Sequence, residues 1–331
     1  MSMFASNGSM LLTGGTFTFI HNAQLNHRRT IQKSFKGHIA LDATHDTNSA
    51  DNPRCHPGTR TAVLQMLEDW AQTRSVDDSN PSHILWLFGP AKVGKSAIAG
   101  SFAAAQAKKH RLAASFFFPP NSGASTNEDE SQRLEKYLIP TIAFQMAFSI
   151  PELQPHIAEA VENNPIIFHQ SAETQVEQLI TVPVLSLTTS PVFRVPRTIV
   201  IDGLDKCGDQ QRILAIIQDT ARRLAGRIKF LIFSRPEPHI ITAFNLPALK
   251  SITHSMDLMA DVNVFDELRV FLKDGFEQVR GARGIKADTF WLQEQFIELI
   301  VFHSRGRFGH ARIALDLARR HCHVGKIRTA L

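Results

Sequence analysis

The residues best suited to chemistry form a glycine-rich loop at Gly89–Ser96, with the sequence GPAKVGKS. The loop fits the pattern GxxxxGK[ST], in which backbone N–H groups surround phosphates, the lysine reaches the terminal phosphates and the hydroxyl binds Mg²⁺. Gly94 permits close approach of the backbone, and a helix that begins near Lys95 would direct free N–H groups and its positive end at the anion. These residue types predict a site for ATP or GTP with Mg²⁺.

The segments on either side of the loop supply the context that this pattern requires. Ile84–Phe88 (ILWLF) is a short apolar run typical of a strand buried in a parallel sheet, and the Ala-rich segment after the loop favours a helix. We therefore expect the phosphates to be bound by Gly89, Pro90, Ala91, Lys92, Val93, Gly94, Lys95, Ser96 and Ala97.

Two acidic residues follow another apolar run, Thr198–Ile201 (TIVI). At the C-terminal end of a parallel strand, a carboxylate approaches the Mg²⁺ that the loop hydroxyl holds, so Asp202 is the predicted metal partner of Ser96. Asp205 is the candidate catalytic residue, which would orient or activate an attacking water. Apolar runs that end in Asp are also common turn starts, and without the upstream loop that interpretation would be preferred.

Arg235 is a candidate sensor of the γ-phosphate. It follows a further apolar run, Ile228–Phe233, and therefore lies at the same edge of the predicted sheet as the loop and Asp202. A surface arginine in a turn before Pro236 is an equally good interpretation of the same residues.

The order of the elements predicts the fold class. Apolar runs alternate with helical patterns as far as Asp261, which implies a parallel sheet with helices on both faces, and the pattern beyond is helical only. The predicted fold is α/β, a three-layer P-loop NTPase with a mostly parallel central sheet and a C-terminal helical extension. The predicted segments are a leader and linker (1–57), the P-loop domain (58–257) and the helical extension with a basic tail (258–331). The other expected elements are helices at Thr61–Gln72, Leu134–Phe148, Ser171–Val182, Gln210–Leu224, Val264–Val279 and Trp291–His303 and strands at Leu112–Phe118 and Leu249–Met256.

Charge is concentrated at one end of the chain. The whole chain carries a formal charge of +5, and residues 301–331 hold seven Lys or Arg against one acid. Without a DNA-binding motif, a solvated helix face or a disordered end is preferred over a contact with nucleic acid or an anionic membrane.

The three cysteines lie far apart and indicate neither a disulfide framework nor a structural zinc site. No apolar run is long enough to cross a bilayer, so we expect a soluble cytoplasmic protein with no transmembrane segment.

Several motifs together point to one family. They are CHPGTR at Cys55–Arg60, GPAKVGKSAIA at Gly89–Ala99, SFFFP at Ser115–Pro119, LIPTIAFQMA at Leu138–Ala147, VIDGLDKC at Val200–Cys207 and FSRPE at Phe233–Glu237. With these motifs the chain resembles the NACHT-type P-loop ATPases of the STAND class, in the NLR-like form abundant in mushroom-forming fungi and related to the nephrocystin amino-terminal region. GGTFTFIHN at Gly14–Asn22 is similar to the leader that precedes this domain in such proteins.

The resemblance implies a signalling switch. ADP would hold a closed, inactive form, ATP would hold an open form that oligomerises and binds protein partners, and hydrolysis would reset the cycle. Innate immunity or self/non-self recognition in fungi is the setting that it implies.

Two departures from the family leave three functions open. Lys206 stands where relatives usually have Glu after DGLD, which removes one candidate catalytic carboxylate. Ser304–Arg312 matches the corresponding apolar helix of relatives only loosely, and neither a winged helix nor sensor repeats follow, so His310 is given no phosphate-sensing role. The candidates are a nucleotide-dependent switch module, an ATP hydrolase of weak activity and a pseudo-NTPase scaffold.

Overall fold

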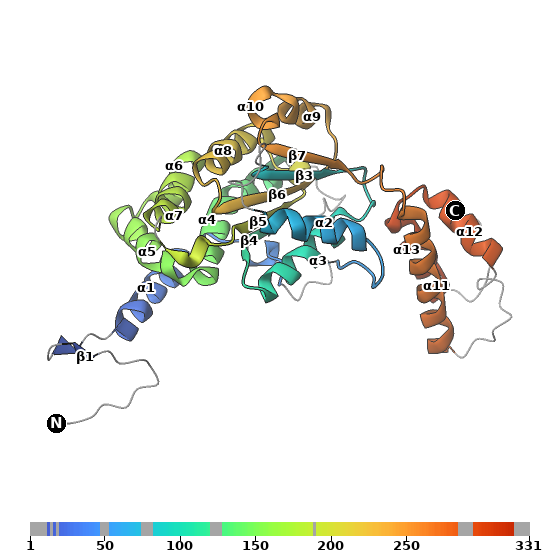
Figure 1. Cartoon of the computed structure of the whole chain (residues 1–331), viewed down its shortest axis with the longest axis horizontal. Helices are drawn as coiled ribbons and strands as arrows, with labels where there is room; N and C mark the ends of the chain where they lie inside the picture. Colours follow the sequence, from blue (N-terminus) through green and yellow to red (C-terminus); the bar gives the residue numbers. More distant parts are fainter. Residues whose placement is uncertain are drawn as a thin grey trace.

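The centre of the fold is a parallel sheet (Figure 1). In the computed structural model, which describes residues 12–13, 16–17, 20–46, 53–73, 82–119, 128–187, 190–283 and 294–320, five strands pair in the order β4-β5-β6-β3-β7. They are β3 (Ile84–Phe88), β4 (Leu112–Phe117), β5 (Arg197–Asp202), β6 (Ile228–Ser234) and β7 (Thr253–Asp257). Neighbouring strands are all parallel, which brings their C-terminal ends to one edge of the sheet.

Alternation along β3 explains why helices cover both faces of the sheet. Ile84 and Trp86 belong to one apolar cluster, and Leu85 and Leu87 belong to another, because successive side chains of a strand point to opposite faces. The cluster with Leu85 includes side chains of α2 (Thr61–Gln72) and α3 (Lys95–Lys108). The opposite cluster includes side chains of α1 (Ile20–Ser34), α4 (Glu128–Ser149), α5 (Gln154–Asn163), α6 (Ala172–Val176), α7 (Val182–Ser186), α8 (Gln210–Arg223), α9 (Pro238–Asn245) and α10 (Pro247–Lys250).

The observed fold confirms the predicted three-layer α/β class. α2 and β3 have the predicted bounds, β4, β6 and α8 differ from the expected ranges by one residue at one end, and β5 is longer than expected by one residue at each end. The last strand begins later than predicted, because α10 occupies the first part of the range Leu249–Met256. Pro247 at the first helical position favours that short helix.

The helix α1 was not anticipated from composition. Polar residues dominate it, yet Ile31 and, just beyond its end, Phe35 lie four residues apart and are fully buried, and α1 packs along α5. Before it, β1 (Leu12–Thr13) and β2 (Thr16–Phe17) pair antiparallel outside the central sheet. The other leader residues before α1, Gly14, Gly15, Thr18 and Phe19, lie outside the described residues.

The predicted C-terminal extension is a bundle of three helices with an apolar core of its own, called the helical bundle below. It consists of α11 (Val264–Arg283), α12 (Glu294–Ser304) and α13 (Phe308–Arg320). Figure 1 shows it at the opposite end of the molecule from α1. The basic segment of the sequence thus includes a helix, α13, which buries Ala311, Ala314, Leu315 and Ala318 and exposes Arg312 and Arg319; residues 321–331 lie outside the described residues.

One edge of the sheet is closed by a side chain. β4 is a terminal strand, and the amide of Gln145 in α4 pairs with its backbone as a neighbouring strand would. The N–H of Ser115 donates to Oε1 of Gln145 at 3.0 Å, and Nε2 of Gln145 donates to the carbonyl of Ser115 at 2.8 Å. Ser149 adds a third bond, from its hydroxyl to the carbonyl of Ala113 at 2.7 Å.

Two glycines of α11 are expected to respond in opposite ways to substitution. A Cβ atom on Gly275 would lie 2.5 Å from Cδ1 of Leu315 in α13, whereas a Cβ on the exposed Gly281 would meet nothing within 4 Å. Gly275→Val should therefore destabilise the bundle by about 1–3 kcal/mol through overpacking, and Gly281→Ala should stabilise it by about 0.5–1 kcal/mol through helix propensity. Thermal unfolding of the two variants checks this, and a stabilising Gly275→Val would contradict the packing described.

Candidate functional site

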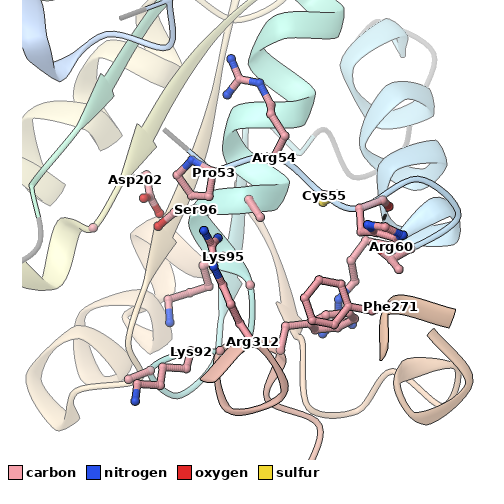
Figure 2. A pocket seen from close by; sticks show the side chains of 18 of the residues that line it. Pro53, Arg54, Cys55, Arg60, Lys92, Lys95, Ser96, Asp202, Phe271 and Arg312 are labelled. Carbon is pink, nitrogen blue, oxygen red and sulfur yellow. Dashed lines mark hydrogen bonds between the residues drawn. The ribbon is translucent and has the colours of Figure 1, made fainter. Parts of the chain in front are cut away.

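The glycine-rich loop joins β3 to α3 at the C-terminal edge of the sheet. Gly94 caps α3 with a φ of 103°, a conformation that favours glycine, and Val93 anchors the loop by being fully buried. Nζ of Lys95 donates to the carbonyls of Gly89 and Pro90, at 2.6 and 2.8 Å. The predicted phosphate-binding lysine is therefore held by its own loop and lies in the cavity shown in Figure 2.

Burial strongly affects the charge of this lysine. Desolvation lowers the pKa of Lys95 to about 8, although the nearby carboxylates of Asp205 and Asp202 act in the opposite direction. An ammonium group whose pKa is so depressed gains stability from any additional negative charge placed beside it. The electrostatics of the loop therefore favour an anion.

Asp202 and Ser96 lie together, as the sequence predicted. Asp202 ends β5 and is almost completely buried, and Ser96 stands in the first turn of α3. Figure 2 shows the two side chains side by side. Burial raises the pKa of Asp202, and a hydrogen bond with Ser96 opposes this rise. Both side chains offer hard oxygen atoms, the ligands that Mg²⁺ prefers.

Asp205 and Arg235 pair with each other. The N–H of Arg235 donates to Oδ1 of Asp205 at 2.9 Å, and its Nε lies 3.4 Å from Oδ2. The Asp205 carboxylate is buried, whereas the Arg235 side chain is half exposed. The candidate catalytic acid and the candidate sensor thus lie at the same edge of the sheet, where sequence reasoning placed them, as an ion pair that the sequence did not reveal.

Lys206 also lines the cavity. Its Nζ donates to the carbonyl of Phe118, just beyond the end of β4, at 2.9 Å. The sequence indicated that a cation replaces a carboxylate here but not where the ammonium group would lie. The structure places it at the same strand ends as Asp202 and Asp205.

Arg60 lines the same cavity, and sequence reasoning gave it no role. It is 2% exposed and precedes α2 with a φ of 54°. Its guanidinium donates to Oδ2 of Asp261 at 2.7 Å and to the carbonyl of Val93 at 3.1 Å, and its N–H donates to Oε1 of Glu267 at 2.7 Å. Arg60 therefore joins the linker before α2 to the phosphate loop through its side chain and to the helical bundle through its backbone N–H. The motif CHPGTR, which ends in Arg60, was the available signal.

The helical bundle meets the phosphate loop directly. The N–H of Gly309, in the first turn of α13, donates to the carbonyl of Lys92 at 3.0 Å. A Cβ on Gly309 would lie only 2.7 Å from Cβ of Lys92, so this approach requires glycine. Lys92 itself has a φ of 69°, a left-handed conformation that costs a non-glycine residue roughly 1–2 kcal/mol. Beside this contact, the guanidinium of Arg60 lies 5.1 Å from the ring centroid of Phe308.

The loop, the strand ends and the helical bundle enclose one cavity of about 460 Å³, within the usual size range of small-molecule sites. In Figure 2, Lys95, Ser96 and Asp202 lie on one side of it and Arg60 and Phe271 on the other. Cationic side chains outnumber acidic ones in its wall. The cations are Arg54, Arg60, Lys92, Lys95, Lys206, Arg235 and Arg312, and the acids are Asp202 and Asp205. The cavity is suited to a polyanion.

A comparison with protein families decides the relationship of this chain. The family described as "Nephrocystin 3, N-terminal" matches residues 58–235, more than half of the chain. The chain belongs to the nephrocystin 3 N-terminal family. This result confirms the resemblance to NACHT-type P-loop proteins that the sequence motifs indicated. No curated protein is significantly similar in sequence to this member of the family.

Three solved structures show a partial similarity to this nephrocystin-family chain. The ORC2 protein of Aeropyrum pernix, in its ADPNP and ADP complexes, is 14% identical, with a TM-score of 0.48 over 86% of this chain and 69% of that one. PCH-2 of C. elegans is 12% identical, with a TM-score of 0.42 over 82% of this chain and 65% of PCH-2. Drosophila ORC, bound to GC-rich DNA and Cdc6, is 10% identical, with a TM-score of 0.37 over 92% of this chain and 46% of that one.

Among the residues that the structure describes, no helix combines the length and the apolar character that a bilayer crossing needs.

Loss of the Arg60 charge should strongly destabilise the fold. Arg60→Met leaves Asp261 and Glu267 buried without their cation, and breaking a buried ion pair in this way costs about 3–5 kcal/mol. Arg223→Met, which breaks a half-exposed pair with Glu177, is the control and should cost no more than about 1 kcal/mol. Urea unfolding followed by tryptophan fluorescence measures both. Equal, small losses for the two variants would show that Arg60 does not hold the parts together.

Proposed function

We propose that this chain is a nucleotide-binding switch module that binds ATP and ADP, and that occupancy of its cavity controls how the helical bundle sits on the phosphate loop. The observation that carries the proposal is the shared cavity: Lys95 and Ser96 line it from the loop, while Phe308 and Arg312 line it from α13. A ligand bound there would contact both parts at once. Its binding energy is therefore available to shift the equilibrium between two arrangements of them.

The residues of the loop support phosphate binding in particular. The N–H groups at the start of α3 and the ammonium group of Lys95 suit the β- and γ-phosphates. Lys95 would leave the carbonyls of Gly89 and Pro90 for the phosphate oxygens, which changes the loop that Gly309 contacts through Lys92. This is the physical link by which phosphate binding would reach the helical bundle.

Mg²⁺ fits the oxygen donors at this position. Ser96 and Asp202 would hold it together with phosphate and water oxygens, since Mg²⁺ usually takes only one or two protein ligands in nucleotide sites. Its charge would stabilise the bound phosphates. The aromatic rings of Phe271 and Phe308, with centroids 5.7 Å apart, offer apolar surface for the base at the other side of the cavity.

The energy scale is sufficient for switching. Moving a two-state equilibrium from 1:99 to 99:1 needs about 5.5 kcal/mol of differential binding. Two or three charge-assisted contacts to a γ-phosphate, at about 1.5–3 kcal/mol each, would supply it. Lys95, Arg235 and the metal on Ser96 and Asp202 are the candidates for these contacts. Arg235 is half exposed, and to reach a phosphate it must loosen its pairing with Asp205.

The switch is proposed to act through protein partners, including other copies of this chain, in the signalling setting that the family resemblance implies, fungal immunity or self/non-self recognition. Hydrolysis is left outside the proposal, because the carboxylate of Asp205 is bonded to Arg235 and an ammonium group stands at position 206. Mass spectrometry of the nucleotide retained by protein purified without added ligand tests the proposal directly, and retained ADP is the expected result.

Lys95→Ala is expected to weaken binding of ADP and ATP by about 10- to 100-fold, because it removes charge-assisted hydrogen bonds worth about 1.5–3 kcal/mol. Lys108→Ala, at the exposed far end of the same helix, is the matched control and should bind as the wild type does. Isothermal titration calorimetry measures the affinities. Equal binding by wild type and Lys95→Ala, or no binding by either, would favour a scaffold without a nucleotide.

Binding should also weaken at alkaline pH. In the free chain the pKa of Lys95 is about 8, and a bound phosphate would raise it by favouring the charged form. Binding therefore takes up a proton above pH 8, and the affinity should fall by up to about tenfold per pH unit from there. Lys95→Arg, which stays charged, should give a nearly flat profile from pH 8 to about pH 9.5. Parallel profiles for the wild type and Lys95→Arg would refute the role given to this group.

A further inference from the structure

Lys206 is held in a fixed position by the backbone around it. Gly203, with a φ of 84°, turns the chain sharply after β5, and the short 3₁₀ helix Leu204–Lys206 follows. The side chain of Lys206 folds back over this turn, so that a Cβ on Gly203 would lie only 3.3 Å from its Nζ. The hydrogen bond from Nζ to the carbonyl of Phe118 holds the ammonium group in this position. The ammonium group therefore stays at the ends of β4 and β5.

This position lies within the electrostatic reach of both acidic residues of the site. Burial lowers the pKa of Lys206, and the carboxylates of Asp202 and Asp205 oppose that fall; burial raises the pKa of Asp202, and Lys206 opposes that rise. Lys95 acts on Asp202 in the same sense, and Arg235 pairs with Asp205. Each carboxylate of the cavity thus has protein cations as neighbours.

A divalent metal ion at a phosphate site has two electrostatic tasks. It neutralises acidic side chains that would repel the phosphates, and it attracts the phosphates themselves. In this cavity Lys206 and Lys95 act toward the first task, because both oppose the burial that raises the pKa of Asp202. Among the residues that the structure describes, no group of three or more His, Cys, Asp or Glu side chains could hold a metal ion without help from a ligand.

We propose that Lys206 is a built-in counter-ion of this site, which makes the binding of ADP nearly independent of Mg²⁺. The inference rests on the proposed nucleotide binding and specifies its dependence on metal. Mg²⁺ still has donors in Ser96 and Asp202 and can add a contact to a γ-phosphate, but its charge adds little to the affinity for ADP, which the protein's own ammonium group supports. Replacing Lys206 by an acid would have the opposite effect, since three carboxylates would then face the same space.

The first test compares dissociation constants for ADP in Mg²⁺ and in EDTA by calorimetry. The ratio of the two constants should stay below about threefold for the wild type and rise by about tenfold in Lys206→Met, as expected for one unit charge at short range in a half-buried site. Lys206→Glu should bind ADP measurably only with Mg²⁺. Lys206→Arg retains the charge and should keep the low ratio, and Lys108→Met is the surface control. A ratio above about tenfold in the wild type, unchanged in Lys206→Met, would overturn the inference.

The second test needs no nucleotide and therefore separates this inference from the proposed function. Mn²⁺ alone, titrated into the protein and followed by electron paramagnetic resonance, should show no specific site in the wild type and one site in Lys206→Glu. Thermal unfolding of each variant checks that it remains folded without the bond to Phe118. If the wild type binds neither ADP nor ATP, the proposed function fails while the Mn²⁺ result still stands. If the wild type binds Mn²⁺ as tightly as Lys206→Glu does, Lys206 is not a counter-ion.

Discussion

The buried charge of Arg60 is the interaction on which the arrangement of this molecule depends. A guanidinium group cannot remain buried without partners, because the loss of hydration costs more than packing returns. Its partners come from three places: the carbonyl of Val93 in the phosphate loop, the carboxylate of Asp261 after β7, and that of Glu267 in α11. The phosphate loop and the helical bundle are therefore held together because both supply partners for the buried charge of Arg60. A shift of the bundle that separates these partners has to rehydrate or re-pair this charge.

Pairing of charged groups also determines the electrostatics of the cavity. The strand ends place two acids in it, and the loop, the turn after β5 and the helical bundle contribute an excess of cations. Lys95 is bonded to its own loop and Arg235 to Asp205, so the site holds its charges in internal pairs. In such a site Lys95 or Arg235 can exchange its internal partner for a ligand without being left unpaired. Reversible recognition of a polyanion is what the proposed function requires of such a site.

Local sequence signals were enough to predict the strands of the sheet and the position of the phosphate loop. Short apolar runs bounded by turn residues placed β3 to β6, and the pattern of the loop specified its position between a strand and a helix. The ion pair between Asp205 and Arg235 and the contacts of Arg60 join residues far apart in the chain, and no local pattern determines which charges meet. α1 was not predicted because few of its residues are apolar. The contact between Gly309 and Lys92 could not be predicted from the sequence. The need for glycine at position 309 arises only from the close packing of the helical bundle on the loop.

The closed edge of the sheet has a consequence for assembly. An unpaired edge strand is a template on which another chain can add a strand. The amide of Gln145 occupies that template on β4, so an incoming strand on this side would have to displace it. The other terminal strand is β7, whose last residue, Asp257, lies seven positions before α11 begins. A partner added there would adjoin the segment that carries Asp261, which makes the outer edge of β7 the place where association and the position of the helical bundle would be mechanically coupled.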